Sequence, residues 1–144
     1  IKRRSESKSM IVLFFFVQRV NGYLDKVPEV AYDMMELSDK PLTLILDGAK
    51  NMAHNLIADD GSVGVRVTSE EFSKQLCARF KRPIVSTSAN ISGEPTPTIF
   101  SEISAEIVGA VDYVVSYRQD DVTSRKPSSI IRLASNGNVK IIRE

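Results

Sequence analysis

The chain has 144 residues, of which 42% are hydrophobic and 26% are charged, and its formal net charge is +1. This balance is typical of a globular domain with its own core, and by itself it provides no strong field for nucleic acid. The longest apolar run is too short to cross a bilayer, and one cysteine with one histidine gives poor support to a zinc site or a Cys-His nucleophile. With no signal peptide visible, we expect a cytoplasmic protein without a membrane partner.

The N-terminal third of the chain is predicted to hold two strands with a helix between them. The apolar run 10–17 predicts a buried strand, which ends near the turn signal Asn21-Gly22. A stretch that begins with proline, 28–38, has apolar residues near helical spacing, so a short helix is expected there. The continuous apolar run 42–46 is typical of a strand covered on both faces.

The next stretch is less regular. Residues 50–61 are ambiguous, and one helical turn is expected before a turn at Asp60-Gly61. Residues 62–67, "SVGVRV", are predicted to form another strand.

The clearest helix is expected over 70–80, with Thr68 or Ser69 as its N-cap. Two glutamates near its start suit the positive end of the helix dipole. Its apolar face is predicted to consist of Phe72, Leu76, Cys77 and Phe80.

The C-terminal part is predicted to continue the alternation and to end in a hairpin. We expect a strand over 83–87, a helix over 98–111 and a strand over 112–116, followed by a polar loop over 118–129. An Asn-Gly pair between two apolar runs predicts the hairpin, with strands 129–134 and 139–143.

Strands that alternate with helices and then close with a hairpin predict an α/β fold. We expect a mixed sheet with helices on its faces. The length fits a single domain over residues 1–144, and no internal repeat is present.

The loop "STSANISG", residues 86–93, leaves a predicted strand and is rich in hydroxyl and amide groups. In open α/β sheets ligands collect beyond strand ends, and such side chains suit phosphate oxygens and hydroxyls. Hydroxyl-rich turns are also common without a ligand, so this loop alone favours a structural role. The first ten residues, "IKRRSESKSM", are the densest basic patch in the chain and by themselves are typical of a solvated terminus.

A resemblance spans nearly the whole chain and depends on five stretches in order: "KRRSESKSMIVL", "PLTLIL", "SVGVRV", "PIVSTSANISGEPTPT" and "KPSSIIRL". Together they resemble the YrdC-like family of threonylcarbamoyl-adenylate synthases. The most specific parts are a K-x-R triplet, Lys2-Arg3-Arg4, and an S-x-N triplet, Ser88-Ala89-Asn90. The resemblance implies a twisted mixed sheet with helices on its faces, the YrdC/RibB-like fold.

The same resemblance implies a nucleotidyltransferase that condenses L-threonine, bicarbonate and ATP into threonylcarbamoyl-AMP and pyrophosphate. Its product feeds the modification of the adenosine next to the anticodon of certain tRNAs. The expected small molecules are therefore ATP with Mg²⁺, bicarbonate and L-threonine. The expected macromolecular partners are tRNA or double-stranded RNA and the downstream threonylcarbamoyl transferase proteins.

Carried over by motif, the resemblance also implies a site. Lys2 and Arg4 are the expected catalytic residues, because fixed cations can hold phosphates and the carboxylated intermediate. Contacts to ATP are expected from Arg4, Lys8, Ser62, Ser88, Asn90, Thr96 and Arg143. Contacts to threonine are expected from Arg66, Ser86 and Ser128. No metal-binding residue is expected.

Three departures from the family pattern are visible. The early strand and the P-T-D-T-x-Y-G-L loop that helps to seat threonine are missing, so a protein that begins at Ile1 is expected to bind threonine poorly. Phe14, Phe15 and Phe16 stand where a strand usually gives way to a polar turn. The family's P-G-P-[LV]-T is replaced by residues 39–43, "DKPLT", with the loss of a glycine.

Three other interpretations stay open. A non-catalytic relative on the same fold would bind nucleotide or double-stranded RNA without making the adenylate, although both triplets are retained here. The related domain of hydrogenase-maturation proteins would bring cysteine zinc motifs, which Cys77 alone cannot supply. The third interpretation is a structural α/β fragment.

Overall fold

The computed structural model describes residues 10–124 and 127–144. The chain forms two compact units. Of the described residues, 10–86 and 128–144 form the sheet unit, and 87–124 with Pro127 form the loop unit.

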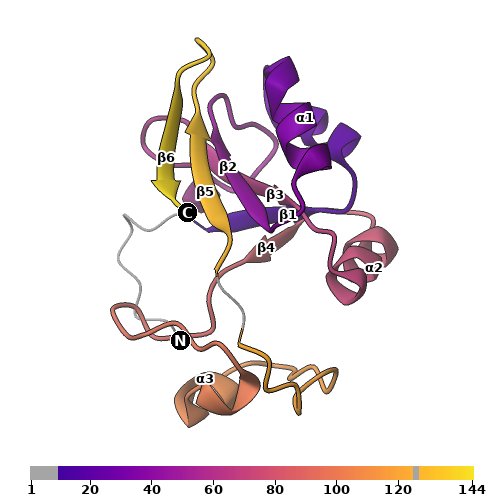
Figure 1. Cartoon of the computed structure of the whole chain (residues 1–144), viewed down its shortest axis with the longest axis vertical. Coiled ribbons are helices and arrows are strands. Elements are labelled where there is room, and N and C mark those ends of the chain that lie inside the picture. Colours follow the sequence, from indigo (N-terminus) through magenta and orange to yellow (C-terminus); the bar gives the residue numbers. More distant parts are fainter. Residues whose placement is uncertain (1–9, 125–126) are drawn as a thin grey trace. The chain divides into compact units, whose positions relative to one another are not determined.

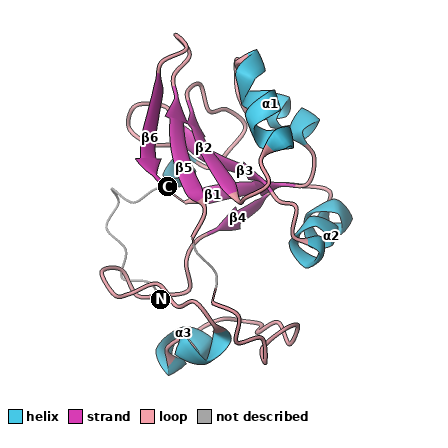
Figure 2. Ribbon diagram, in the orientation of Figure 1, coloured by secondary structure: helices cyan, strands magenta, loops and turns pink. Residues whose placement is uncertain are grey.

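The sheet unit is built on six described strands in the order β4-β1-β3-β2-β5-β6 (Figures 1 and 2). β1 pairs in parallel with β3, as β2 does with β5, whereas the β1-β4, β2-β3 and β5-β6 pairs are antiparallel. The predicted α/β class with a mixed sheet is therefore confirmed. The bounds are Ile11–Phe14 for β1, Leu42–Leu46 for β2, Val63–Val67 for β3, Ile84–Ser86 for β4, Ser129–Leu133 for β5 and Val139–Arg143 for β6.

Two α-helices belong to the sheet unit, α1 over Glu29–Leu37 and α2 over Glu71–Phe80, close to the predicted ranges. Short 3-10 helices cover Val17–Gly22 and His54–Leu56, and the second is the helical turn expected within 50–61. None of the helices in the described ranges is long and apolar enough to span a membrane.

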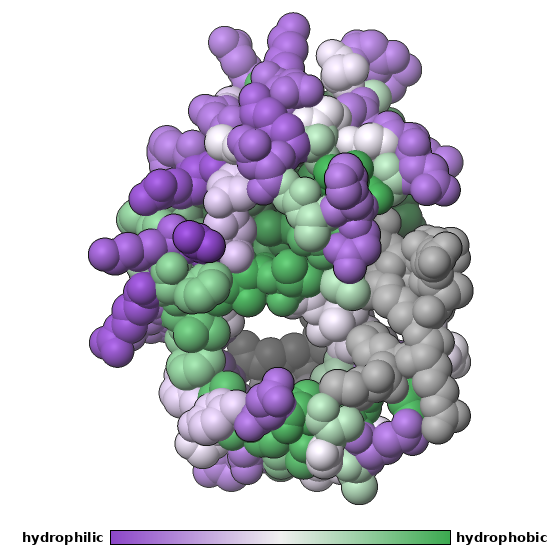
Figure 3. Space-filling view, turned by 180° about the vertical axis from the view of Figure 1, so that it is seen from behind, coloured by the Kyte–Doolittle hydropathy of each residue, from purple (hydrophilic) through white to green (hydrophobic). Residues whose placement is uncertain are grey.

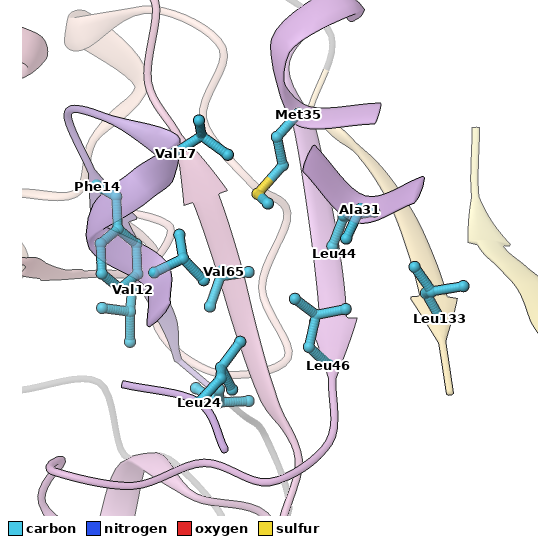
Figure 4. Packing of buried hydrophobic residues seen from close by; sticks show 12 residues of the cluster. Val12, Phe14, Val17, Leu24, Ala31, Met35, Leu44, Leu46, Val65 and Leu133 are labelled. Atoms are coloured by element: carbon cyan, nitrogen blue, oxygen red, sulfur yellow. The ribbon is translucent and has the colours of Figure 1, made fainter. Parts of the chain in front are cut away.

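The core of the sheet unit lies on the face of the sheet where α1 packs (Figure 4). Directly opposed residues of neighbouring strands share a face, and the register places Val12, Val65 and Leu44 in one row on this face. Ala31 and Met35, four residues apart in α1, are the buried residues of that helix. Because burying a side chain such as that of Leu44 contributes about 1.5–3 kcal/mol, this apolar row stabilises α1 on the sheet.

The predicted strand 10–17 is longer than the strand that forms. β1 ends at Phe14, and a 3-10 helix begins at Val17. Val17 and Val20 are both buried, and a spacing of three residues places them on one side of a 3-10 helix. Burial of these two valines explains why the chain leaves the sheet before Val17.

The predicted N-cap of α2 is wrong. The N-cap is Glu70 rather than Thr68 or Ser69, and its carboxylate accepts hydrogen bonds from the backbone N–H groups of Phe72 at 3.2 Å and Ser73 at 2.8 Å. A carboxylate at this end of a helix also interacts favourably with the helix dipole.

The apolar side chains of α2 are mostly at the surface. Cys77 is fully buried, as expected, whereas Leu76 is 46% and Phe80 is 59% exposed. On the one face that Figure 3 shows, hydrophobic surface is gathered in patches among hydrophilic residues. The sheet unit therefore buries one side of its sheet well and leaves part of α2 exposed.

In the loop unit, the predicted helix 98–111 is two short helices. A 3-10 helix covers Phe100–Glu102 and α3 covers Ala105–Gly109. Between them Ser104 is extended, and its hydroxyl accepts a hydrogen bond from the N–H of Ile107 at 3.4 Å. Ser104 is thus an N-cap, which explains why α3 begins after it.

The predicted strand 112–116 is wrong. These residues form neither strand nor helix, and Tyr113 is 77% exposed. The described part of the loop unit contains no strand that could pair with them. A β-prone stretch forms a strand only where a partner takes up its backbone hydrogen bonds.

The closing hairpin is confirmed. β5 and β6 pair antiparallel, and the backbone N–H of Ala134 donates to the carbonyl of Asn138 at 2.9 Å. Gly137 has a φ of +85° in the turn, a conformation that glycine adopts without strain.

Candidate active site

The face of the sheet opposite the core carries a group of polar side chains. Arg66 lies in β3 and Thr43 lies in the neighbouring β2. Side chains alternate between faces along a strand, so these two point away from the face that holds Val65 and Leu44. We call the group formed by Arg66, Thr43, Ser128 and Arg143 the arginine cluster.

The guanidinium of Arg66 is held by two buried hydroxyl groups. Its Nε and Nη2 donate to Oγ1 of Thr43 at 3.1 and 3.0 Å, and Nη2 also donates to Oγ of Ser128 at 2.6 Å. The two hydroxyls lie 3.0 Å from each other. Thr43 is 1% and Ser128 is 4% exposed, so the sheet fixes the position of the guanidinium.

Arg143 reaches the same point from the last strand. Its Nε and Nη2 donate to the backbone carbonyl of Ser128 at 2.9 and 2.7 Å. The register pairs Thr43 with Ile130 and Ile130 with Arg143, which places Arg143 on the face of Thr43. Ser128 therefore joins two guanidinium groups: its hydroxyl accepts from Arg66 and, at 3.4 Å, from Arg143, and its carbonyl accepts from Arg143.

The two guanidinium groups have no carboxylate partner among the described residues. Burial, and secondarily the positive charge of Arg143, lowers the pKa of Arg66. Neighbouring cations without a counterion attract an anion, and a planar guanidinium suits bidentate binding of carboxylate or phosphate. The arginine cluster can therefore hold such a group.

Arg132, on the same face, has the opposite arrangement. Its Nη2 donates to Asp47 at 2.9 Å and its Nη1 to Asp60 at 2.8 Å. Asp60 also accepts hydrogen bonds from the hydroxyl of Ser62 at 2.6 Å and from its N–H at 3.0 Å. The bonds from Ser62, together with Arg132, lower the pKa of Asp60 from 3.8 to about 2. The charge of Arg132 is thus compensated, unlike that of Arg66.

Two predicted ligand residues of the sheet unit lie outside the arginine cluster. Ser86 pairs with Ile11, which pairs with Gly64, so Ser86 lies on the face of Arg66 but two strands away. Strands in a sheet are about 4.8 Å apart, so β4 and β3 are separated by roughly 10 Å. Ser62, predicted to contact ATP, is 3% exposed, and its hydroxyl donates to Asp60.

The S-x-N loop lies in the loop unit. The side-chain amide of Asn90 donates to the backbone carbonyls of Glu94 at 2.7 Å and Ile91 at 3.1 Å. These bonds close the turn, and the buried side chain of Ile91 anchors it. Ser88 and Thr96 are exposed.

The predicted catalytic residues Lys2 and Arg4 lie outside the described residues, as does Lys8. Their meeting with Ser88 and Asn90 stays a prediction. In the described ranges, no group of three or more His, Cys, Asp or Glu residues is placed to hold a metal ion.

Thr43 is a member of the arginine cluster that the sequence motifs do not identify. A signal for it was present, because Thr43 is the polar residue in the otherwise apolar strand "LTLIL". A buried hydroxyl in such a strand needs a hydrogen-bond partner, and a partner on a neighbouring strand could have been sought.

Comparison with known proteins gives the family. The family model Sua5_yciO_yrdC, described as telomere recombination, matches residues 1–144. The chain belongs to the Sua5/YciO/YrdC family. The threonylcarbamoyl-AMP synthase of Pseudoalteromonas translucida (strain TAC 125) is 30% identical over 142 residues, which cover 96% of this chain and 74% of that protein.

Solved structures of Sua5 and YciO share the fold of this Sua5/YciO/YrdC chain. P. abyssi Sua5 complexed with L-threonine has a TM-score of 0.82 and 23% identity, and the match covers 99% of this chain and 41% of that one. E. coli YciO has a TM-score of 0.81 and 22% identity, with 100% of this chain and 69% of that one covered. The chain thus spans less than half the length of P. abyssi Sua5.

Proposed function

We propose that this Sua5/YciO/YrdC chain carries the L-threonylcarbamoyladenylate synthase reaction. L-Threonine, bicarbonate and ATP give threonylcarbamoyl-AMP, pyrophosphate and water. The observation that carries the proposal is the arginine cluster, in which two guanidinium groups without a described carboxylate partner meet at Ser128. The relative from P. translucida bears the name of this activity.

The chemistry explains why such a cluster is needed. The amine of threonine and bicarbonate form a carbamate with loss of water, and a carbamate oxygen then attacks the α-phosphorus of ATP while pyrophosphate leaves. Every reactant except the attacking amine carries negative charge near the reacting atoms. Catalysis of this kind depends on positioning and on fixed positive charge rather than on a covalent nucleophile.

In this proposal different residues of the sheet unit bind different anionic groups of the substrates. Arg66 and the hydroxyl of Ser128 bind the carboxylate of threonine, with Ser86 farther along the same face. Arg143 stands at the edge of the sheet and holds a phosphate of the nucleotide. Thr43 touches Arg66 and keeps its guanidinium in place.

The remaining assignments are the nucleotide contacts. Lys2, Arg4 and Lys8 would provide cations, and Ser88, Asn90, Thr96 and Ser62 would provide hydrogen bonds. Mg²⁺ would arrive bound to the ATP phosphates. The product would then pass to threonylcarbamoyl transferase proteins acting on tRNA in the cytoplasm.

The experiment is an omission series. Pyrophosphate release and threonylcarbamoyl-AMP, the latter identified by mass spectrometry, are measured with ATP, L-threonine and bicarbonate, and each substrate is left out in turn. Release is expected only when all three are present. Unchanged release without threonine would exclude the synthase, and ATP binding without any product would favour the non-catalytic nucleotide-binding relative.

A further inference from the structure

A cavity lies at the end of the sheet where β1 and β3 stop. It has a volume of about 280 Å³ and is lined by Phe15, Phe16 and Val17 after β1, and by Thr68 and Ser69 after β3. β1 and β3 are parallel, so both chains leave the sheet at their carboxyl ends here. Ligands of open α/β sheets bind at such ends.

Two stretches that the sequence analysis singles out meet in this cavity. Phe15 and Phe16 belong to the run of three phenylalanines over 14–16, and Lys40 directly precedes Pro41 before β2; all three line the cavity. The arginine cluster uses none of these residues.

Thr68 supplies a polar group that points to a ligand. It is 8% exposed, and its hydroxyl has no hydrogen-bond partner within the described residues. Among the described residues, however, no fully buried side-chain nitrogen or oxygen lacks a hydrogen-bond partner. The hydroxyl of Thr68 therefore keeps some accessibility, and Thr68 is a residue of the cavity wall. A nearly buried hydroxyl without a protein partner can form a hydrogen bond with a bound ligand.

Cations and aromatic rings form the rest of the wall. Lys74 Nζ lies 5.9 Å from the centre of the Phe16 ring, and the rings of Phe15 and Phe16 lie 5.0 Å apart. Neither Lys74 nor Lys40 has a carboxylate partner in the part of the chain that the structure describes, and Glu36 is the acidic residue in the wall. Two lysines against one glutamate leave the wall with a net positive charge.

We propose that this cavity binds a small organic anion with an apolar or aromatic body, of the aromatic carboxylate class. Lys74 and Lys40 would meet the carboxylate, Thr68 would donate a hydrogen bond to it, and the Phe15–Phe16 pair would pack on the apolar body. The volume is near the lower end of ordinary ligand pockets, so the ligand is small.

The cavity is separate from the arginine cluster. Its wall includes Met35 of α1, which packs on the core face, and Val17, both of which are labelled in Figure 4. Val67, another wall residue, follows Arg66 in β3 and therefore points to the opposite face. Ligand binding here does not compete with binding at Ser128 for the same groups.

The test is an NMR titration of the ¹⁵N-labelled chain with phenylacetate, with the neutral phenylacetamide as the matched probe. Phenylacetate is expected to shift the backbone amides of Phe16, Thr68 and Ser69 saturably, with phenylacetamide binding at least about tenfold more weakly, because it lacks the charge-assisted bond. No saturable shift with phenylacetate would overturn the proposal, as would shifts confined to Arg66 and Ser128.

Variants assign the contacts. Lys74→Gln is expected to weaken phenylacetate binding about tenfold, and Thr68→Val, which keeps the side-chain shape, several-fold. Lys50→Gln is the matched control, since Lys50 is ion-paired with Asp25 at 3.3 Å and is not in the cavity wall. Equal weakening by Lys74→Gln and Lys50→Gln, or none by Lys74→Gln and Thr68→Val, would overturn the proposal.

Discussion

Nη2 of Arg66 donates a hydrogen bond to Oγ of Ser128 at 2.6 Å, although the two residues are 62 positions apart in the sequence. β3 carries Arg66, Ser128 directly precedes β5, and Thr43 of β2, which lies between those strands, touches both residues. The sheet order therefore brings together residues that no local motif joins. It also brings Arg143 to the same serine from β6.

Replacing Arg66 tests its role in binding an anionic substrate. Arg66→Gln is expected to lower the rate of threonylcarbamoyl-AMP formation by about 100-fold, because one preorganised charge contact contributes about 3 kcal/mol. The measurement is kcat/KM for threonine. Lys140→Gln is the control. Lys140 is an exposed cation of β6 and lies opposite Arg132 in the strand register, on the same face of the sheet. If both variants lose the same activity, general charge rather than the arginine cluster is responsible.

Thr43 can be tested with a pair of variants. Thr43→Val keeps the shape but removes the oxygen that accepts two hydrogen bonds from Arg66. We expect the free energy of unfolding to fall by about 1–3 kcal/mol and KM for threonine to rise, because a half-buried guanidinium loses its acceptor. Thr43→Ser, which restores the hydroxyl, should recover most of both values. A valine variant as active as the serine variant would show that Thr43 does not position Arg66.

The lowered pKa of Asp60 predicts that the stability of the fold decreases in acid. This pKa is about 2 in the folded chain, lowered from 3.8. A carboxylate with a depressed folded pKa contributes stability above about pH 4, and this contribution is lost as the pH falls toward 2. The free energy of unfolding of Asp60→Asn, measured with urea, should be lower than that of the unchanged chain near neutral pH. It should also vary less between pH 4 and pH 2. An unchanged slope in that range would contradict the assignment.

The core face predicts a contrast between two leucines. Leu44 is fully buried in β2, whereas Leu37 at the end of α1 is 77% exposed. Leu44→Ala is expected to lower the free energy of unfolding by about 2–5 kcal/mol through lost burial and the cavity left behind. Leu37→Ala should change it by less than about 0.5 kcal/mol. Urea denaturation of both variants measures the two changes in the free energy of unfolding. Similar changes would mean that the core lies elsewhere.

Local pattern was sufficient for the strands and helices that bury a face. The run 42–46 and the Asn-Gly hairpin predict β2 and the β5-β6 pair correctly, because apolar periodicity and turn chemistry are local. Residues 112–116 contain a β-prone stretch but form no strand, since pairing depends on a partner elsewhere in the chain. The cap at Glu70 was missed because neighbouring hydroxyl residues have the same capping chemistry.

The candidate site was predictable in its residue types but not in its connections. The motifs identify Arg66 and Ser128 singly, and only the strand order shows that they share a hydrogen bond. Thr43 was not identified, because its contribution comes from a register between strands. The assignment of Lys2 and Arg4 stays a prediction, since both lie outside the described residues.

The most direct test of the account is whether the arginine cluster holds the carboxylate of threonine. L-Threonine is titrated into the ¹⁵N-labelled chain while the side-chain Nε–H signal of Arg66 is followed by NMR, and L-threoninamide, which lacks the carboxylate, is titrated in parallel. The account predicts a saturable shift of the Arg66 signal with threonine and none with threoninamide. An equal response to both compounds, or no response to threonine, would contradict it.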